Sequence, residues 1–151
     1  MAVLRRTEDG GRVGWTVEAA EGLQARIDPD DLTEALGALL ENAARHASAA
    51  VQVSAAAAGT GGVRVAVRDD GAGIPEAELA RLTGRGARLD LTGPGAGLGL
   101  AIAGEIADAA GGRLELANRA PGLEVALWLP AAARADGALT PGVRTTSGGR
   151  R

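Results

Sequence analysis

Two polar residues three positions apart, Asn42 and Arg45, lie in a segment rich in alanine and leucine at 36–46. If this segment is helical, both side chains share one face. An amide oxygen can bind a hard cation such as Mg²⁺, which commonly also binds the phosphates of a substrate. An arginine one turn further along could reach those phosphates. The same two residues also fit a solvated helix surface, so the pair alone leaves both interpretations open.

A second group of candidate residues runs from Asp69 to Pro75. An alternating apolar strand ends in two acidic residues, and Gly71 and Gly73 follow at once. Because glycine has no Cβ, such a turn lets a flat ligand lie against the backbone. A carboxylate at the strand end could accept a hydrogen bond from an exocyclic amine. An ordinary acidic turn would have the same sequence features.

Four alternating glycines at 93–99 lead directly into an apolar segment of helical character. Free backbone N–H groups and the positive end of the helix dipole form a binding site for anions. A flexible linker is the alternative interpretation. A linker rarely runs straight into an apolar helix, however, so this pattern favours phosphate binding.

The elements that must position these residues follow from apolar and turn-forming patterns. One helix should begin after Asp28, a capping residue, with Pro29 in its first turn, and extend to about His46. Paired strands, two further helices and a mobile glycine-rich loop are also expected. The strands are expected as a hairpin within 15–27, at 51–55 with 63–67, and at 114–117 with 123–129; the helices at 76–82 and 98–110; the loop at 83–97. This order predicts an α+β fold with helices layered on one face of a mixed sheet.

Composition limits the possible functions. The 151 residues fit one domain, expected at 15–130 between a flexible leader at 1–14 and a disordered tail at 131–151. The absence of cysteine excludes disulfides and thiolate metal sites. All 16 basic residues are arginine, which excludes a Walker-type phosphate loop with its lysine. A net charge of −3 argues against nucleic acid as a partner. Short apolar runs predict no membrane contact by this segment. A cytoplasmic location is expected, and a place within a membrane-bound sensor stays open.

The three groups taken in order resemble the N, G1 and G2 boxes of the GHKL (Bergerat-fold) ATPase superfamily. Within it, Leu39-Leu40-Glu41-Asn42-Ala43 and Gly95-Ala96-Gly97-Leu98-Gly99-Leu100-Ala101-Ile102 are most similar to sensor histidine kinases. The resemblance covers about residues 15–130. It implies a two-layer α/β sandwich, in which three helices cover one face of a mixed, mostly antiparallel sheet and a mobile lid closes over ATP.

The resemblance also implies a role for each site residue. Asp69 would bind the adenine amino group, while Asn42 would hold Mg²⁺ and Arg45 would contact the phosphates. The remaining binding residues would shape the adenine pocket (Gly71, Gly73 and Ile74) or line the triphosphate (Gly95, Gly97, Leu98, Gly99 and Leu100). Arg85 and Arg88 resemble an arginine pair that some histidine kinases direct at the phosphates, although two exposed loop arginines are an equal alternative.

The sequence departs from the family pattern at two places. Many members carry Asn or Glu one turn before the metal-binding Asn, and Ala38 stands there in this chain. A Glu at that position activates water in the ATPase members, so its loss argues against self-contained ATP hydrolysis. The phenylalanine before the lid is also missing, and Leu82 stands in its place. This replacement puts contact with the dimerisation helices in doubt.

The single histidine, His46, is followed by Ala47 and Ser48 rather than by the acid and arginine that follow a phosphoacceptor histidine in this family. We therefore expect a structural role at the pocket edge. The predicted function is that of a histidine kinase catalytic domain. It would transfer the γ-phosphoryl group of ATP to a histidine on a separate dimerisation domain, upstream of a response regulator. An anti-sigma-type serine kinase and a non-catalytic ATP sensor are the alternatives.

Overall fold

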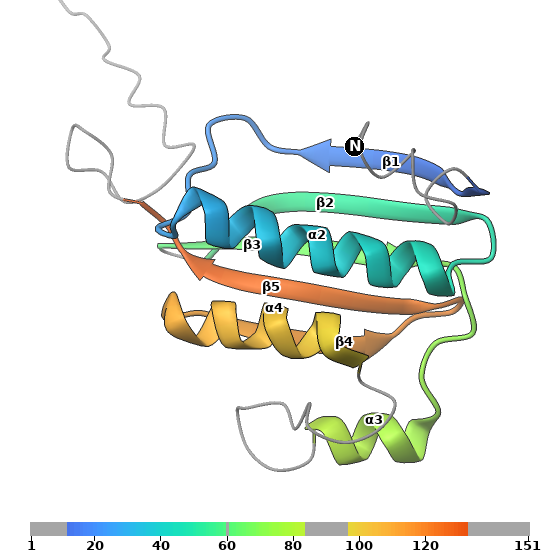
Figure 1. Cartoon of the computed structure of the whole chain (residues 1–151). Helices are drawn as coiled ribbons and strands as arrows, with labels where there is room; N and C mark the ends of the chain where they lie inside the picture. The colour runs from blue at the N-terminus through green and yellow to red at the C-terminus, as the bar shows by residue number, and fades with distance from the viewer. Residues whose placement is uncertain (1–11, 60, 84–96, 133–151) are drawn as a thin grey trace, which may run out of the picture.

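The computed structural model describes residues 12–59, 61–83 and 97–132, and these form one sheet with helices against it (Figure 1). Its strands lie in the order β1-β2-β3-β5-β4. The described strands are β1 (Gly14–Ala19), β2 (Ala50–Ala58), β3 (Gly62–Asp69), β4 (Arg113–Asn118) and β5 (Leu123–Pro130). The described helices are α2 (Pro29–His46), α3 (Glu76–Thr83) and α4 (Gly97–Ala109). The predicted helices and the two later strand pairs are therefore confirmed.

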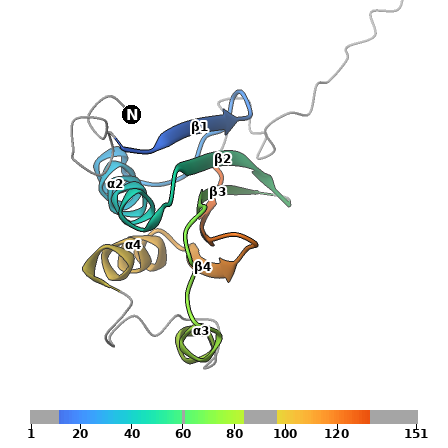
Figure 2. The same ribbon diagram turned by 90° about the vertical axis from the view of Figure 1, so that its right-hand side faces the viewer.

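The helices α2 and α4 lie side by side on one face of the sheet, and α3 lies beyond the β4 edge (Figure 2). The core fills the space between this helix layer and the sheet, with Leu39 of α2 facing Val67 and Leu127. All three side chains are buried. The predicted α+β sandwich with a mixed, mostly antiparallel sheet is confirmed. No described helix is long and apolar enough to cross a membrane.

The helix α2 begins where its capping signal predicts. The Oδ1 atom of Asp28 accepts hydrogen bonds from the backbone N–H groups of Asp30 (2.8 Å) and Asp31 (3.4 Å), and Pro29 occupies the first turn. These bonds satisfy two of the donors that a helix start leaves free. The face with Ala35, Leu39 and residues 43–44 is buried, whereas Asn42 is half-buried beside this face and Arg45 is exposed.

The hairpin predicted within 15–27 is wrong. Strand β1 pairs instead in parallel with β2, with Gly14 opposite Ala50, and α2 provides the crossover that parallel neighbours require. After the turn at Gly22, the chain does not fold back on β1. It crosses to the end of β5, where the N–H of Arg26 donates to the carbonyl of Pro130 (2.7 Å). The turn expected between 15 and 27 is present at Gly22, but the strand that pairs with β1 is β2, which follows only after α2.

The two tryptophans lie on different strands. Trp15 of β1 is half-buried and packs against the core. Trp128 of β5 lies on the face that α2 and α4 leave open, opposite Arg64 of β3 and Arg113 of β4 in the sheet register. Both guanidinium groups lie over its ring, at 5.5 Å and 4.4 Å from the ring centre, and cation–π attraction stabilises this arrangement.

Candidate nucleotide site

The last residue of β3, Asp69, is the one charged side chain that is fully buried among the described residues, with 3% of its surface exposed. Its Oδ1 atom accepts a hydrogen bond from the N–H of Gly71 (2.8 Å). No basic side chain pairs with it in the described part of the chain. A buried carboxylate is costly without hydrogen-bond donors, so the site suits a ligand that supplies one.

The turn after Asp69 contains glycine because neighbouring protein atoms leave no room for a Cβ. A Cβ at Gly71 would collide with the carbonyl oxygen of His46. A Cβ at Gly73 would lie 2.7 Å from Oδ1 of Asn118, and the φ of Gly73 is +74°. The sequence suggested that these glycines make room for a flat ligand. The structure adds a second reason, because they let the turn dock against α2 and β4.

Two residues that support this turn were not identified from the sequence. Asn118, at the end of β4, makes hydrogen bonds with both backbone groups of Ile74. Gly122, between β4 and β5, lies so close to Asp69 that a Cβ would collide with the Asp69 carbonyl oxygen. Both lie more than 40 residues along the chain from the turn that they support. From the sequence alone, Asn118 and Gly122 indicated only the turn of the hairpin between the strands expected at 114–117 and 123–129.

A cavity of about 170 Å³ opens over Asp69. Its walls combine an acid, an amide and a histidine with several apolar side chains. They come from α2 (Asn42, His46), the turn (Asp69, Ala72, Gly73, Ile74, Pro75), α3 (Glu78), α4 (Leu100) and β5 (Leu123). Apolar walls with a single buried acceptor fit a flat heterocycle that carries an amino group.

A second cavity of about 260 Å³ adjoins the first, and Asn42 lines both. It lies between α2 and the start of α4, where the first backbone N–H groups of a helix are free to bind an anion. Its lining is Ala38, Glu41, Asn42, Arg45, Gly97, Leu98, Gly99 and Ile102. The two helices approach closely here, since a Cβ at Gly99 would lie 3.4 Å from the carbonyl oxygen of Ala38.

The structure thus brings most of the predicted site residues to these two cavities. The residues lining them are Asn42, Arg45, Asp69, Gly73, Ile74, Gly97, Leu98, Gly99 and Leu100, and Gly71 hydrogen-bonds to Asp69 beside them. Gly95, Arg85 and Arg88, together with most of the predicted lid, lie outside the described residues.

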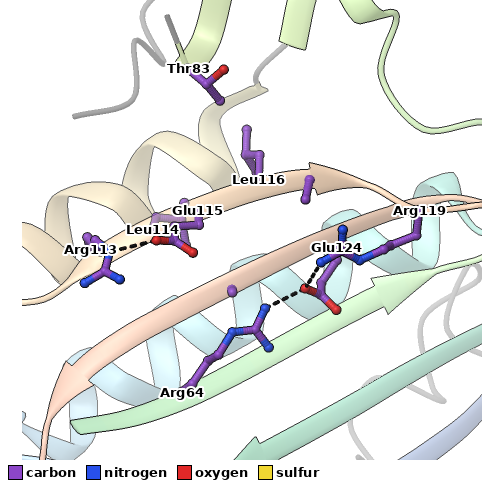
Figure 3. Close-up of a pocket in the computed structure, with 10 residues that line it drawn as sticks. Arg64, Thr83, Arg113, Leu114, Glu115, Leu116, Arg119 and Glu124 are labelled. Atoms are coloured by element: carbon purple, nitrogen blue, oxygen red, sulfur yellow. Dashed lines mark hydrogen bonds and ion pairs between the residues drawn. The ribbon is translucent and has the colours of Figure 1, made fainter. Parts of the chain in front are cut away.

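A different cavity, of about 420 Å³, lies against β4 and β5 (Figure 3). Its charged groups already pair with one another. Glu124 bridges Arg64 and Arg119, and Arg113 pairs with Glu115. Partial burial raises the pKa of Glu124, but its hydrogen bond with Arg64 and the charges of both arginines outweigh this effect and lower it. In contrast, the side chains of Asn42 and Arg45 make no hydrogen bond or ion pair with the described residues. The first two cavities are therefore the better ligand site.

An acid at a strand end, an amide shared between two cavities and a glycine-rich helix start, all on an α/β sandwich, define a nucleotide-binding domain of the GHKL class. The family described as histidine kinase-, DNA gyrase B-, and HSP90-like ATPase matches residues 27–133. The chain belongs to this family.

Relatives place the chain more narrowly within the family. It is 44% identical over 120 residues to the sensor protein kinase CarS of Pseudomonas aeruginosa, which covers 79% of this chain and 26% of CarS. It is 36% identical over 118 residues to the sensor histidine kinase component HK1 of Mycobacterium tuberculosis, covering 76% of this chain and 70% of HK1. The chain thus spans about a quarter of CarS. Within the family, the chain is similar to the ATP-binding domains of sensor histidine kinases.

Solved structures agree with this placement. The mycobacterial sensor histidine kinase MprB superposes with a TM-score of 0.62 at 26% identity, over 86% of this chain and 87% of that one. The catalytic domain of histidine kinase ThkA superposes with a TM-score of 0.67 at 25% identity, over 79% and 80% of the two chains.

Proposed function

We propose that this chain is the catalytic domain of a two-component sensor kinase, which binds Mg-ATP and transfers the γ-phosphoryl group to a histidine on a separate dimerisation domain. A response regulator would then act downstream. The observation that carries the proposal is the buried carboxylate of Asp69, which pairs with no basic side chain among the described residues and lies in a cavity that continues through Asn42 to the start of α4.

The adenine ring would occupy the first cavity, with its amino group donating to Asp69. Ile74 and Leu100 would contact the ring faces, and Gly71 and Gly73 would shape the turn beneath it. The triphosphate would lie in the second cavity, against the N–H groups at Gly97 and Gly99 and beside Leu98. Arg45 would neutralise phosphate charge there. By resemblance alone, Gly95, Arg85 and Arg88 would complete the phosphate contacts from the lid.

Magnesium fits the residues present, provided that ATP supplies most of its ligands. No group of three or more His, Asp or Glu side chains that could hold a metal occurs among the described residues. Asn42 offers an amide oxygen at the junction of the two cavities. Mg²⁺ typically combines few protein ligands with waters and phosphate oxygens. The metal would neutralise charge on the transferring phosphoryl group, which is the main requirement of this chemistry.

The phosphoacceptor would come from elsewhere. The carbonyl group of His46 packs against Gly71, and the residue lines the adenine-side cavity rather than the phosphate side. Ala38 offers no carboxylate to activate water. This chain would therefore position and polarise ATP, while an acceptor domain would supply the attacking imidazole.

Calorimetric titration with Mg-ATP tests the nucleotide site. Asp69→Asn should weaken binding about 10- to 150-fold, because a charge-assisted hydrogen bond contributes about 1.5–3 kcal/mol. Glu18→Gln, an exposed acid-to-amide change on β1, is the matched control and should leave binding unchanged. Failure of the wild type to bind Mg-ATP would contradict the proposal.

Phosphoryl transfer needs a second assay. The chain is mixed with [γ-³²P]ATP and the separately expressed dimerisation domain of CarS, and the labelled product is treated with acid. Acid-labile label on the dimerisation domain supports a histidine kinase. Tight nucleotide binding without any transfer would instead favour an ATP-dependent interaction module, and acid-stable label would favour a serine kinase.

A further inference from the structure

A guanidinium group from the start of the described chain caps the end of α2. The Nη2 atom of Arg12 donates to the carbonyl of Ala44 (2.9 Å), and its Nη1 atom donates to those of Ala47 (2.9 Å) and Ser48 (3.2 Å). The last carbonyls of a helix lack intrahelical partners and carry partial negative charge, so a cation is favoured there. Arg12 is separated from these residues by more than 30 positions, and only Val13 lies between it and β1.

A carboxylate holds the same stretch through its amide groups. The Oδ1 atom of Asp70 accepts hydrogen bonds from the backbone N–H groups of Ser48 (2.8 Å), Ala49 (3.0 Å) and Ala50 (3.1 Å). The connection from α2 to β2, residues 47–50, is therefore fixed by two opposite charges. Arg12 binds its carbonyl side, and Asp70 binds its amide side.

This connection adjoins the nucleotide site through His46 and through its partner Asp70. Its preceding residue, His46, lines the adenine-side cavity and packs through its carbonyl against Gly71. Its carboxylate partner, Asp70, directly follows Asp69. A shift of the connection would therefore change how α2, with Asn42 and Arg45, is aligned with the turn that carries Asp69.

We propose that Arg12 and Asp70 are positioning residues for nucleotide binding, and that Arg12 couples the segment leading into the domain to the ATP site. The inference rests on the proposed function, because it concerns the affinity of that same site. Linkage makes the coupling reciprocal. Anything that withdraws Arg12 from the end of α2 weakens ATP binding, and bound ATP strengthens the hold of α2 on Arg12.

A helix cap without a positioning role would behave differently. It would contribute to the free energy of unfolding but would leave the affinity of the folded protein unchanged. Nucleotide affinity must therefore be measured at a temperature where every variant is folded, next to a local readout at residues 48–50. Hydrogen–deuterium exchange of these backbone amides, followed by NMR, gives that readout.

The variants are Arg12→Ala and Arg12→Lys, with Arg113→Ala as the control. Arg113 is an arginine of β4 that pairs with Glu115, and neither residue lines either of the two cavities. For Arg12→Ala we expect about 5- to 20-fold weaker Mg-ATP binding, near the lower end of measured site-to-site couplings. Exchange at residues 48–50 should also be faster. Lysine should restore part of both effects, since it keeps the charge but lacks the planar fork that spans several carbonyls. Arg113→Ala should match the wild type.

The outcomes separate this inference from the function on which it rests. If the wild type binds Mg-ATP and Arg12→Ala binds equally well, Arg12 is only a stabilising cap and the inference is overturned, whether or not exchange accelerates. If the wild type does not bind Mg-ATP, the proposed function itself fails. Slower exchange at residues 48–50 of the wild type after addition of Mg-ATP, lost in Arg12→Ala, supports the reciprocal coupling directly.

Discussion

The side-chain amide of Asn118 pairs with the backbone of Ile74 as one peptide group pairs with another. Its Oδ1 atom accepts from the Ile74 N–H (2.9 Å), and its Nδ2 atom donates to the Ile74 carbonyl (2.6 Å). Through these two bonds, the end of β4 fixes the turn that forms one wall of the candidate adenine cavity.

Replacing Asn118 should therefore weaken both the fold and the site. Asn118→Ala removes both hydrogen bonds with Ile74 and a longer one to Oε1 of Glu76 (3.3 Å). The two bonds with Ile74 each have a net contribution of about 0.5–1.5 kcal/mol, so the free energy of unfolding should fall by about 1–3 kcal/mol. Urea denaturation measures this loss, and Mg-ATP calorimetry should show weaker binding. Asn118→Asp keeps the acceptor but places a carboxylate oxygen against the Ile74 carbonyl and Glu76, so it should be no more stable than the alanine variant. Wild-type behaviour of Asn118→Ala would contradict the assigned contact.

Gly122 and Gly111 form a matched pair for testing close packing against Asp69. Both have positive φ, 94° and 80°, but a Cβ at Gly122 collides with Asp69, whereas a Cβ at Gly111 meets no atom within 4 Å. Gly111→Ala should cost only backbone strain, about 1–2 kcal/mol. Gly122→Ala should cost more in thermal or urea unfolding and should also weaken Mg-ATP binding. Equal losses in the two variants would show that Gly122 is not needed for contact with Asp69.

The carboxyl group of Asp70 should make stability depend on pH. Hydrogen bonds from the backbone of Ala49 and Ala50, and then Ser48, lower its pKa, against a smaller opposing effect of desolvation. A carboxyl whose pKa is lower in the folded state stabilises the protein above its unfolded pKa of about 3.9. This stabilisation is lost as the pH falls through the folded value.

Asp70→Asn cannot titrate, so its melting temperature should fall less steeply than that of the wild type between about pH 6 and pH 3. The difference in stability between the two proteins should therefore be greatest near neutral pH and shrink in acid. Melting curves across this range provide the measurement. If the melting temperatures of the two proteins fell in parallel as the pH was lowered, Asp70 would not contribute to the loss of stability in acid.

The packing between α2 and the sheet should dominate stability. Leu39 is 1% exposed in the core, so Leu39→Ala should cost about 2–5 kcal/mol. Leu98, at the start of α4, is 77% exposed, and Leu98→Ala should change the free energy of unfolding by no more than about 0.5 kcal/mol. Urea denaturation distinguishes these values easily. A small effect at Leu39 would argue against the observed orientation of α2.

Local signals were sufficient to predict much of this fold. The start of α2 could be read from Asp28 and Pro29, because a capping side chain bonds to residues two and three positions away. Alternating valines predicted β3 and its end at Asp69. The start of α4 could also be predicted, because the glycines lead directly into an apolar helical segment and a helix start depends on nearby residues.

Contacts between distant residues could not be predicted in this way. Nothing near Trp15 indicates that β1 pairs in parallel with β2, since its partner is reached only after α2. Asn118 and Ile74 lie 44 residues apart, and Arg12 and Ala47 lie 35 apart. Asn118 and Arg12 are ordinary polar residues in their local sequence. Their roles can be recognised only when the fold brings them to their partners.

The placement of the two tryptophans gives the protein two spectroscopic probes. The chain contains no tyrosine or phenylalanine, so Trp15 and Trp128 account for all of its intrinsic fluorescence. Trp128 lies between two guanidinium groups on the open face, whereas Trp15 packs against the core three residues after Arg12. In a Trp128→Phe protein, the emission would come from Trp15 alone and would report on β1, which follows Arg12. In a Trp15→Phe protein, it would report only on Trp128 and the open face, so the two faces of the sheet can be followed separately during a titration without an attached dye.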